Sequence, residues 1–259
     1  MAASIPAARS ALAEALADAA GAVIRPYFRQ PIAVDDKSDT SPVTIADREA
    51  EQAMRALIAA KFPADGIFGE EFGTVRKDAE WVWVLDPIDG TKSFISGIPL
   101  FGTLIALLHR GRPVLGIIDQ PISHERWRGV AGQASTHNGN AIRARQCTDL
   151  AAATLFATAP DMFRGADAGA FARLKSRAKL TRHGGDCYAY GLVASGFIDL
   201  VVEASLKPYD YCAIVPVVEG AGGAMTDWQG KPLGLASDGR VIAAGDRALH
   251  KAALALLAG

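Results

Sequence analysis

The chain has 259 residues, of which 50% are hydrophobic and 21% are charged. This composition excludes a disordered chain and supplies enough apolar material for one large domain or two small ones. Lys and Arg number 27 against 28 Asp and Glu, for a net charge of -1. Because no overall field would attract nucleic acid or an anionic membrane surface, we expect neither as a partner.

The cysteines and the N-terminal segment predict a cytoplasmic protein. The three cysteines show no CxxC spacing, so neither a disulfide framework nor a zinc site is indicated. The Ala-rich stretch over residues 10–24 contains Glu14 and Asp18, which a secretory signal does not tolerate. No segment approaches the ~18 uninterrupted apolar residues that a membrane span needs.

Spacings of three and four between apolar residues predict two amphipathic helices in the first half of the chain. Thr44 and Asp47, three residues apart, match a capping box at the start of the second helix. A later apolar run predicts a strand that stops at Asp86-Pro87. The predicted elements are helices over residues 7–28 and 44–58, a strand over 81–85 and antiparallel strands over 101–127.

Strands and helices alternate in the second half, which indicates an α/β layered arrangement. The predicted strands cover residues 154–158, 181–185 (a strand with its turn), 198–203 and 241–244, and the helices cover 168–178, 188–194, 209–219 and 246–257. We therefore expect an N-terminal α+β domain with an antiparallel sheet over residues 1–145 and a C-terminal α/β domain over 146–259. The fold class is α/β, with α+β layers.

The motif Asp86-Pro87-Ile88-Asp89-Gly90-Thr91 brings two carboxylates into a small volume at the end of a strand. Like charges held that close raise one another's pKa unless a cation neutralises them, so the motif requires a shared proton or a metal ion. An isolated motif of this kind is more often a turn with an Asp helix cap. Here Gly90 and Thr91 follow directly, and their N–H groups suit a phosphate.

Two further acidic residues extend this hypothesis. Glu70, in Phe68-Gly69-Glu70-Glu71-Phe72-Gly73, offers the oxygen ligand that Mg²⁺ prefers, although a solvated acidic turn is the simpler interpretation. Asp210 lies between a predicted strand and a predicted helix, where it can cap the helix, project into a cleft, or do both.

Together these residues resemble the inositol monophosphatase-like family of metal-dependent, lithium-sensitive phosphatases. The resemblance covers nearly the whole chain and rests on Gly69-Glu70-Glu71, on residues 86–91, and on Asp210 with the later Gly220-Ala221-Gly222-Gly223. The longer strings over residues 86–97 and 184–191 are most similar to the histidinol-phosphatase branch. The chain departs from the common pattern at Tyr209, where Trp is usual, and at Lys92-Ser93.

The resemblance implies an αβαβα sandwich, as in the sugar phosphatases, and two or three Mg²⁺ ions per active site. It implies metal ligands at Glu70, Asp86, the Ile88 carbonyl, Asp89 and Asp210, and catalytic roles for Asp47, Thr91 and Glu70. Such ions offset the repulsion between a phosphate ester and a hydroxide-like nucleophile. The alternative for Asp47 is a helix cap or an i,i+4 contact on the helix surface. The implied substrate-binding residues are Ile88, Asp89, Gly90, Thr91, Gly185, Asp186, Glu203 and Asp210.

Substrate choice is expected to depend on Asp186 and Glu203, which match family positions that contact the leaving alcohol. Two carboxylates there favour a cationic alcohol such as histidinol, whereas inositol carries no charge. The alternative for Asp186 is helix capping. Lys37 matches a position near the metals, and Arg182 and His183 receive no role.

Three hypotheses follow. The first is a Mg²⁺-dependent phosphatase of L-histidinol phosphate in histidine biosynthesis, and the second is an inositol-1-phosphatase or another small sugar-phosphate phosphatase. The third is a non-catalytic, metal-dependent anion-binding protein. Such a protein would be free to lose the motif's acidic residues, yet all of them are present. The resemblance also suggests a homodimer and inhibition by Li⁺.

Overall fold

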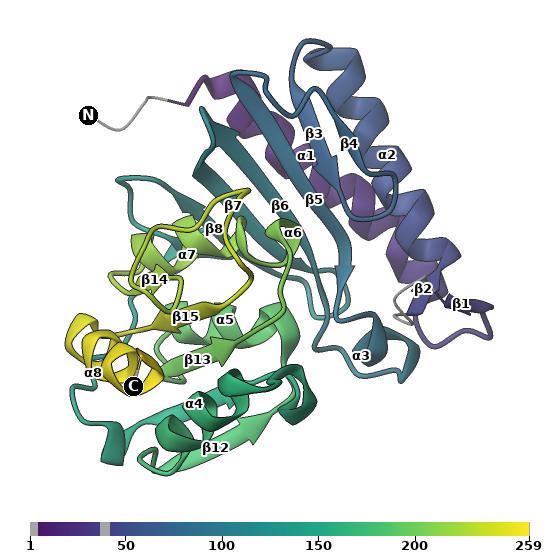
Figure 1. The fold of residues 1–259 in the computed structure, drawn as a ribbon. Helices are drawn as coiled ribbons and strands as arrows, with labels where there is room; N and C mark the ends of the chain where they lie inside the picture. The colour runs from purple at the N-terminus through teal and green to yellow at the C-terminus, as the bar shows by residue number, and fades with distance from the viewer. Residues whose placement is uncertain (1–4, 37–41, 259) are drawn as a thin grey trace.

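The computed structural model describes residues 5–36 and 42–258 of the chain. In these residues the secondary structure is layered as helices, sheet, helices, sheet and helices (Figure 1). The predicted αβαβα sandwich is therefore confirmed. Lys37 lies outside the described residues.

The first layer consists of helices α1 (Ala7–Ile24) and α2 (Ile45–Lys61), which pack on one face of the first sheet. Helix α1 ends before the predicted residue 28, because the chain tightens into a 3₁₀ turn over Arg25–Tyr27 that contains a proline. The predicted capping box of α2 is confirmed. Both the backbone N–H and the hydroxyl of Thr44 donate to Asp47 Oδ2, at 2.8 and 2.6 Å. A small antiparallel hairpin of β1 (Val34–Asp36) and β2 (Pro42–Thr44) precedes this helix.

The first sheet of the described residues has eight strands. Their spatial order is β10 (Asn140–Ala141), β9 (Thr136–His137), β8 (Glu125–Val130), β7 (Arg112–Gln120), β6 (Gly102–His109), β5 (Trp81–Asp89), β3 (Gly66–Gly69) and β4 (Thr74–Val75). Strands β6 to β8 form the predicted antiparallel meander, and β5 pairs antiparallel with β6, whereas β3 runs parallel to β5. The parallel strand was not predicted.

Strand β5 also corrects a prediction. It does not stop at Asp86-Pro87 but continues to Asp89, with a register shift against β6 between Asp86 and Asp89. Proline has no N–H to offer the ladder, so the pairing is interrupted there while the extended backbone continues. The short helix α3 (Thr91–Ile95) then begins after Gly90.

The second sheet of the described residues has five strands. Their order is β12 (Leu180–His183), β11 (Thr154–Ala157), β13 (Leu200–Glu203), β15 (Val241–Ala244) and β14 (Ala224–Thr226). Strand β11 is parallel to both of its neighbours, and β15 is antiparallel to both of its own. Helices α4 (Ala166–Lys175) and α8 (Arg247–Ala258) form the last layer on this sheet (Figure 1).

The middle layer consists of α5 (Asp186–Ala194), α6 (Pro208–Tyr211) and α7 (Ile214–Gly220), between the two sheets (Figure 1). The helix predicted over residues 209–219 is therefore interrupted. Pro216 has no N–H to donate to the carbonyl of Cys212 four residues earlier, so regular helical bonding fails at this point.

Buried apolar side chains form three clusters in the described residues, and these clusters correspond to the interfaces of the sandwich. One joins α1 and α2 to the first sheet, a second joins both sheets to α5 and α7, and a third joins the second sheet to α4 and α8. Helix α7, from the second half of the chain, packs against β7 and β8 of the first. The domain boundary at residues 145/146 stays a prediction.

None of the described helices combines the length and the apolar character that crossing a membrane would require. The three cysteines, Cys147, Cys187 and Cys212, are free thiols in this structure.

Candidate active site

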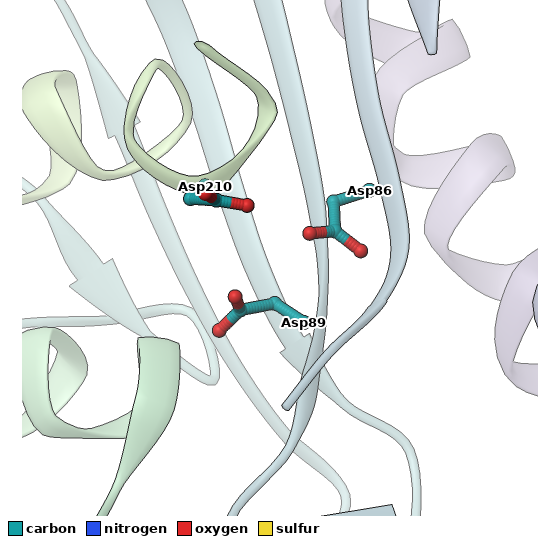
Figure 2. A group of neighbouring side chains, drawn as sticks. All are labelled: Asp86, Asp89 and Asp210. Carbon is teal, nitrogen blue, oxygen red and sulfur yellow. The ribbon is translucent and has the colours of Figure 1, made fainter. Parts of the chain in front are cut away.

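Three aspartates converge where β5 meets the start of α6. Asp86 and Asp89 come from β5, and Asp210 comes from α6 more than a hundred residues later. One carboxylate oxygen from each lies within 4.8 Å of the others. Figure 2 shows the three carboxylates turned toward a common volume. This spacing allows a divalent cation to contact all three residues.

The aspartate cluster, Asp86, Asp89 and Asp210, is electrostatically strained without a cation. Burial, together with neighbouring carboxylates, raises the pKa of Asp86 and of Asp89 well above the ordinary value, and raises the pKa of Asp210 to about 7. Within the described residues, Asp86 Oδ1 is buried and has no hydrogen-bond partner. A buried acceptor without a donor is costly, so the cluster fits a bound metal ion.

Backbone donors fix the orientation of two members of the cluster. Asp89 Oδ2 accepts the N–H of Cys187 at 2.6 Å, and Asp210 Oδ2 accepts the N–H of Lys207 at 2.7 Å. Asp210 therefore caps α6, although not as the N-cap residue: Lys207 occupies the N-cap position and Asp210 is the third residue of the helix. Its carboxylate bonds back to the helix start and still faces the cluster (Figure 2).

Glu70 lies in the turn after β3, beside the cluster. Its charge raises the pKa of both Asp86 and Asp210, and it lines the same cavity as Asp89 and Asp210. Its backbone N–H donates to the Leu85 carbonyl at 3.2 Å, so the turn is held against β5. Glu70 is not among the three residues whose oxygens lie within 4.8 Å of one another, but its carboxylate is an oxygen donor of the kind that suits Mg²⁺.

Asp47 and Thr91 face each other between α2 and α3. Asp47 is completely buried, and its Oδ2 atom accepts both hydrogen bonds of the capping box. Its Oδ1 atom lies 3.4 Å from the Thr91 hydroxyl, which also lies 3.1 Å from the Ile88 carbonyl oxygen. The two alternatives for Asp47, helix cap and partner of Thr91, thus coexist in one side chain.

A cavity of about 280 Å³ opens over the cluster. Its lining brings together Glu70, Asp89, Gly90, Thr91 and Asp210 from the predicted site with Asp186 and Glu203, and adds Pro42, Lys92, Thr158, Met162, Cys187, Tyr190 and Leu206. Asp86, Ile88 and Gly185 are buried and do not line it, and neither do the exposed Arg182 and His183.

Asp186 contacts the motif turn directly. The helix-capping alternative is wrong, because Gly185 is the N-cap of α5 and Asp186 is its first residue. The Ser93 hydroxyl donates to Asp186 Oδ2 at 2.7 Å. A Cβ atom on Gly90 would lie 2.8 Å from the Asp186 carboxyl group, and Gly90 has φ +87°. Glycine at position 90 therefore permits both the turn and this close approach.

Glu203 is buried, and each of its oxygens accepts one hydrogen bond from the protein. Its two oxygens accept the N–H of Thr158 at 2.8 Å and the hydroxyl of Tyr190 at 2.9 Å. Burial raises its pKa to about 7. Sequence analysis missed Thr158 and Tyr190, although Tyr190 lies within the 184–191 string that carried the resemblance.

Comparison with known proteins agrees with this fold. The model of the inositol monophosphatase family matches residues 7–258, and the chain belongs to that family. The phosphatases of this family are metal-dependent, and the aspartate cluster is consistent with a bound metal ion.

Individual relatives differ in their described activities. The chain is 52% identical to the chloroplastic bifunctional phosphatase IMPL2 of Arabidopsis thaliana, over 95% of this chain and 73% of that protein. It is 38% identical to a histidinol-phosphatase of Chlorobaculum parvum, over 90% of each chain. A solved inositol monophosphatase from Zymomonas mobilis superposes with a TM-score of 0.91 at 51% identity, covering 99% of this chain and 100% of that one.

Proposed function

We propose that the protein is a Mg²⁺-dependent phosphomonoesterase that hydrolyses L-histidinol phosphate to L-histidinol and phosphate, a reaction of histidine biosynthesis. The observation that carries the proposal is the presence of two acidic groups in one cavity. The aspartate cluster suits cations that bind a phosphate, and Asp186 with Glu203 suits a cationic alcohol. The histidinol-phosphatase relative from Chlorobaculum parvum supports the same substrate.

Glu70, Asp86, Asp89, Asp210 and the Ile88 carbonyl would hold two or three Mg²⁺ ions. The unpartnered Asp86 Oδ1 and the raised pKa values of the cluster support this assignment. When bound, Mg²⁺ supplies positive charge to the phosphate ester and lowers the pKa of bound water.

Asp47 and Thr91 would orient the attacking water. Because Asp47 Oδ2 is occupied by Thr44, only Oδ1 faces the Thr91 hydroxyl. When Thr91 donates its proton to Asp47, its oxygen lone pairs are available to accept a proton of the water. The N–H groups of Gly90 and Thr91, at the start of α3, would hold phosphoryl oxygens.

Asp186 and Glu203 would bind the leaving alcohol. Both carboxylates line the cavity beside the cluster, and an ammonium or imidazolium group between them would gain charge-assisted hydrogen bonds. Burial would strengthen those bonds, because water screens them less. An uncharged polyol would gain less binding free energy from the same two carboxylates.

The second candidate is myo-inositol 1-phosphate, favoured by the likeness to the inositol monophosphatase from Zymomonas mobilis. The test is kcat/KM for histidinol phosphate and for inositol 1-phosphate, measured by phosphate release in excess Mg²⁺. We expect histidinol phosphate to be preferred by at least about tenfold, the difference that one charge-assisted hydrogen bond provides. A preference for inositol 1-phosphate would overturn the first proposal and support the second candidate.

Absence of phosphate release from either ester would instead support the non-catalytic anion-binding protein. A homodimer, inhibition by Li⁺ and a cytoplasmic location stay predictions.

A further inference from the structure

Helix α2 contributes a second buried carboxylate one turn after Asp47. Glu51 follows Asp47 by four residues, so both side chains project from the same face of the helix. Glu51 is completely buried, and nothing in the proposed chemistry uses it. Its contacts lead to the turn that carries Glu70.

The Glu51 carboxylate is bonded to that turn by backbone donors. Glu51 Oε2 accepts the N–H of Glu71 at 2.7 Å, and Oε1 accepts the N–H of Phe72 at 3.2 Å. Successive backbone N–H groups directed at one carboxylate form a geometry that fixes several backbone dihedrals at once. The backbone immediately after Glu70 is therefore held from α2.

Arg55, one turn further along α2, completes the contact. Its Nε atom donates to Glu51 Oε1 at 2.7 Å, and its guanidinium group also donates to the Gly73 carbonyl. The turn itself is closed by the N–H of Gly69 bonding to the Gly73 carbonyl at 3.0 Å. Glu51 and Arg55 thus bond to the turn over residues 71–73 from one helix face.

Gly69 shows how closely the turn approaches this pair. A Cβ atom at position 69 would collide with the Glu51 carboxylate and would lie 2.6 Å from the Arg55 guanidinium. Only glycine allows the backbone to pass there. The contact is therefore direct, with no room for water between the turn and Glu51.

We propose that Glu51, supported by Arg55, is a positioning residue that holds Glu70 in place for the metal ions before they bind. Glu51 is not itself a ligand, because its oxygens already accept bonds from two amides and one guanidinium. It acts by holding a carboxylate that would otherwise withdraw from the negative charges of the cluster. This inference rests on the proposed role of Glu70 as a metal ligand.

The decisive experiment is metal binding to the metal-free protein, measured by Mn²⁺ titration with electron paramagnetic resonance. The isosteric Glu51→Gln variant replaces an acceptor with an NH₂ group that opposes an amide N–H. We expect the affinity for Mn²⁺ to fall by about tenfold, the effect of losing an outer partner of a metal ligand. Turnover at saturating Mg²⁺ should recover to within about threefold of the unsubstituted protein, because the ligands themselves are intact.

Hydrogen exchange of the metal-free protein gives an independent readout. The amides of Glu71 and Phe72 should exchange faster in Glu51→Gln, since their acceptor is weakened. Glu49→Gln is the matched control, because Glu49 lies on the same helix, is exposed and bonds to Tyr27 away from the turn. Its Mn²⁺ affinity and turn exchange should not change.

A double substitution separates this inference from the proposed function. If Glu51 acts through Glu70, then adding Glu51→Gln to Glu70→Gln should produce no further loss of Mn²⁺ affinity. If Glu70→Gln alone binds Mn²⁺ normally, the ligand assignment in the proposed function is wrong. If Glu70→Gln binds weakly while Glu51→Gln binds normally, only the positioning role is overturned.

A merely structural role for Glu51 would lower the melting temperature and leave the Mn²⁺ affinity unchanged, and this result would refute the proposal. Should Glu51→Gln fail to fold, Arg55→Gln takes its place, because it keeps the carboxylate and removes the guanidinium link to Gly73. We expect a smaller loss of Mn²⁺ affinity in the same direction. Unchanged affinity in a folded Arg55→Gln protein would likewise overturn the inference.

Discussion

The site has two acidic walls that differ in how their charges are satisfied: the metal wall is the aspartate cluster, and the alcohol wall is Asp186 with Glu203. On the metal wall, Asp86 has a buried oxygen without a partner, and the pKa of Asp86 is raised by burial and by neighbouring carboxylates. On the alcohol wall, Glu203 is equally buried, yet both of its oxygens accept bonds from the protein. The metal wall thus has a buried carboxylate oxygen without a hydrogen-bond donor, whereas both oxygens of Glu203 on the alcohol wall have one.

This difference suggests that the two walls have different functions. A carboxylate cluster left short of donors destabilises the metal-free fold and gains when cations bind. A carboxylate held by an amide and a phenol has a defined position before any ligand arrives. Substitutions on the metal wall should therefore abolish turnover, while those on the alcohol wall should change which ester is preferred.

The largest expected effect is that of Asp86→Asn. The substitution keeps the shape of the side chain and removes one ligand charge, so turnover should fall by more than about 100-fold, the upper range for loss of even an outer partner. The metal-free variant should melt no lower than the unsubstituted protein, because repulsion in the cluster is relieved. Phosphate release and thermal melting measure the two effects.

Asp119→Asn is the matched control for that variant. Asp119 is a buried aspartate outside the site, and it is paired with Arg126 at 2.6 Å. Its replacement should lower the melting temperature while leaving stabilisation by Mg²⁺ intact. Undiminished turnover in Asp86→Asn would contradict the contrast between the walls.

A smaller, selective effect is expected for Glu203→Gln. Loss of a charge-assisted hydrogen bond worth about 1.5–3 kcal/mol should lower kcat/KM for histidinol phosphate by about 10- to 100-fold. The value for inositol 1-phosphate should change by less than about threefold, because a polyol gains little from the charge. Steady-state kinetics on both esters give the ratio.

Tyr190→Phe is the control for Glu203→Gln, because it removes a donor to Glu203 without changing the charge. The preference between the two esters should be retained in this variant. If Glu203→Gln instead slows both esters equally, the alcohol wall does not select substrate by charge.

The smallest expected effect is on the pH dependence of stability. In the metal-free protein the pKa of Asp210 and that of Glu203 are each raised to about 7, from 3.8 and 4.5. Below about pH 7 the folded state therefore binds more protons than the unfolded state, so stability should fall as the pH rises from about 4 to 7 and then level off. Melting temperatures in a chelator should drop by several degrees over this range.

Adding Mg²⁺ should make this decrease in melting temperature with pH smaller, because cations stabilise the ionised cluster. A melting temperature that rises with pH between about 5 and 7 in the chelator would show that the cluster is not strained. An equal drop with and without Mg²⁺ would place the titrating groups outside the metal wall.

Much of the site was predictable from local patterns. Asp86, Asp89, Gly90 and Thr91 lie in one continuous motif, and Thr44 with Asp47 forms a capping box whose geometry follows from helix spacing. The meander after β5 was predicted from alternating apolar runs and turns. Such features depend on neighbours in the chain, so the sequence carries their signal.

Other features depended on packing between distant segments. The extension of β5 to Asp89 follows from pairing with β6, and the bonds of Glu203 follow from β11 and α5 lying beside β13. Glu51 did leave a signal, since a carboxylate four residues after Asp47 must share its helix face. Its partner, the turn after Gly69, becomes evident only when α2 packs beside β5.

By itself, the order of the residues determined the family, the layered fold class and the acidic types at the candidate site, because motif spacing and apolar period are properties of the chain. Only the tertiary structure decided which carboxylates stay short of donors and which are satisfied. Hydrogen-bond donors such as the Thr158 amide and the Tyr190 hydroxyl reach their acceptors through space, across separations that no local pattern encodes.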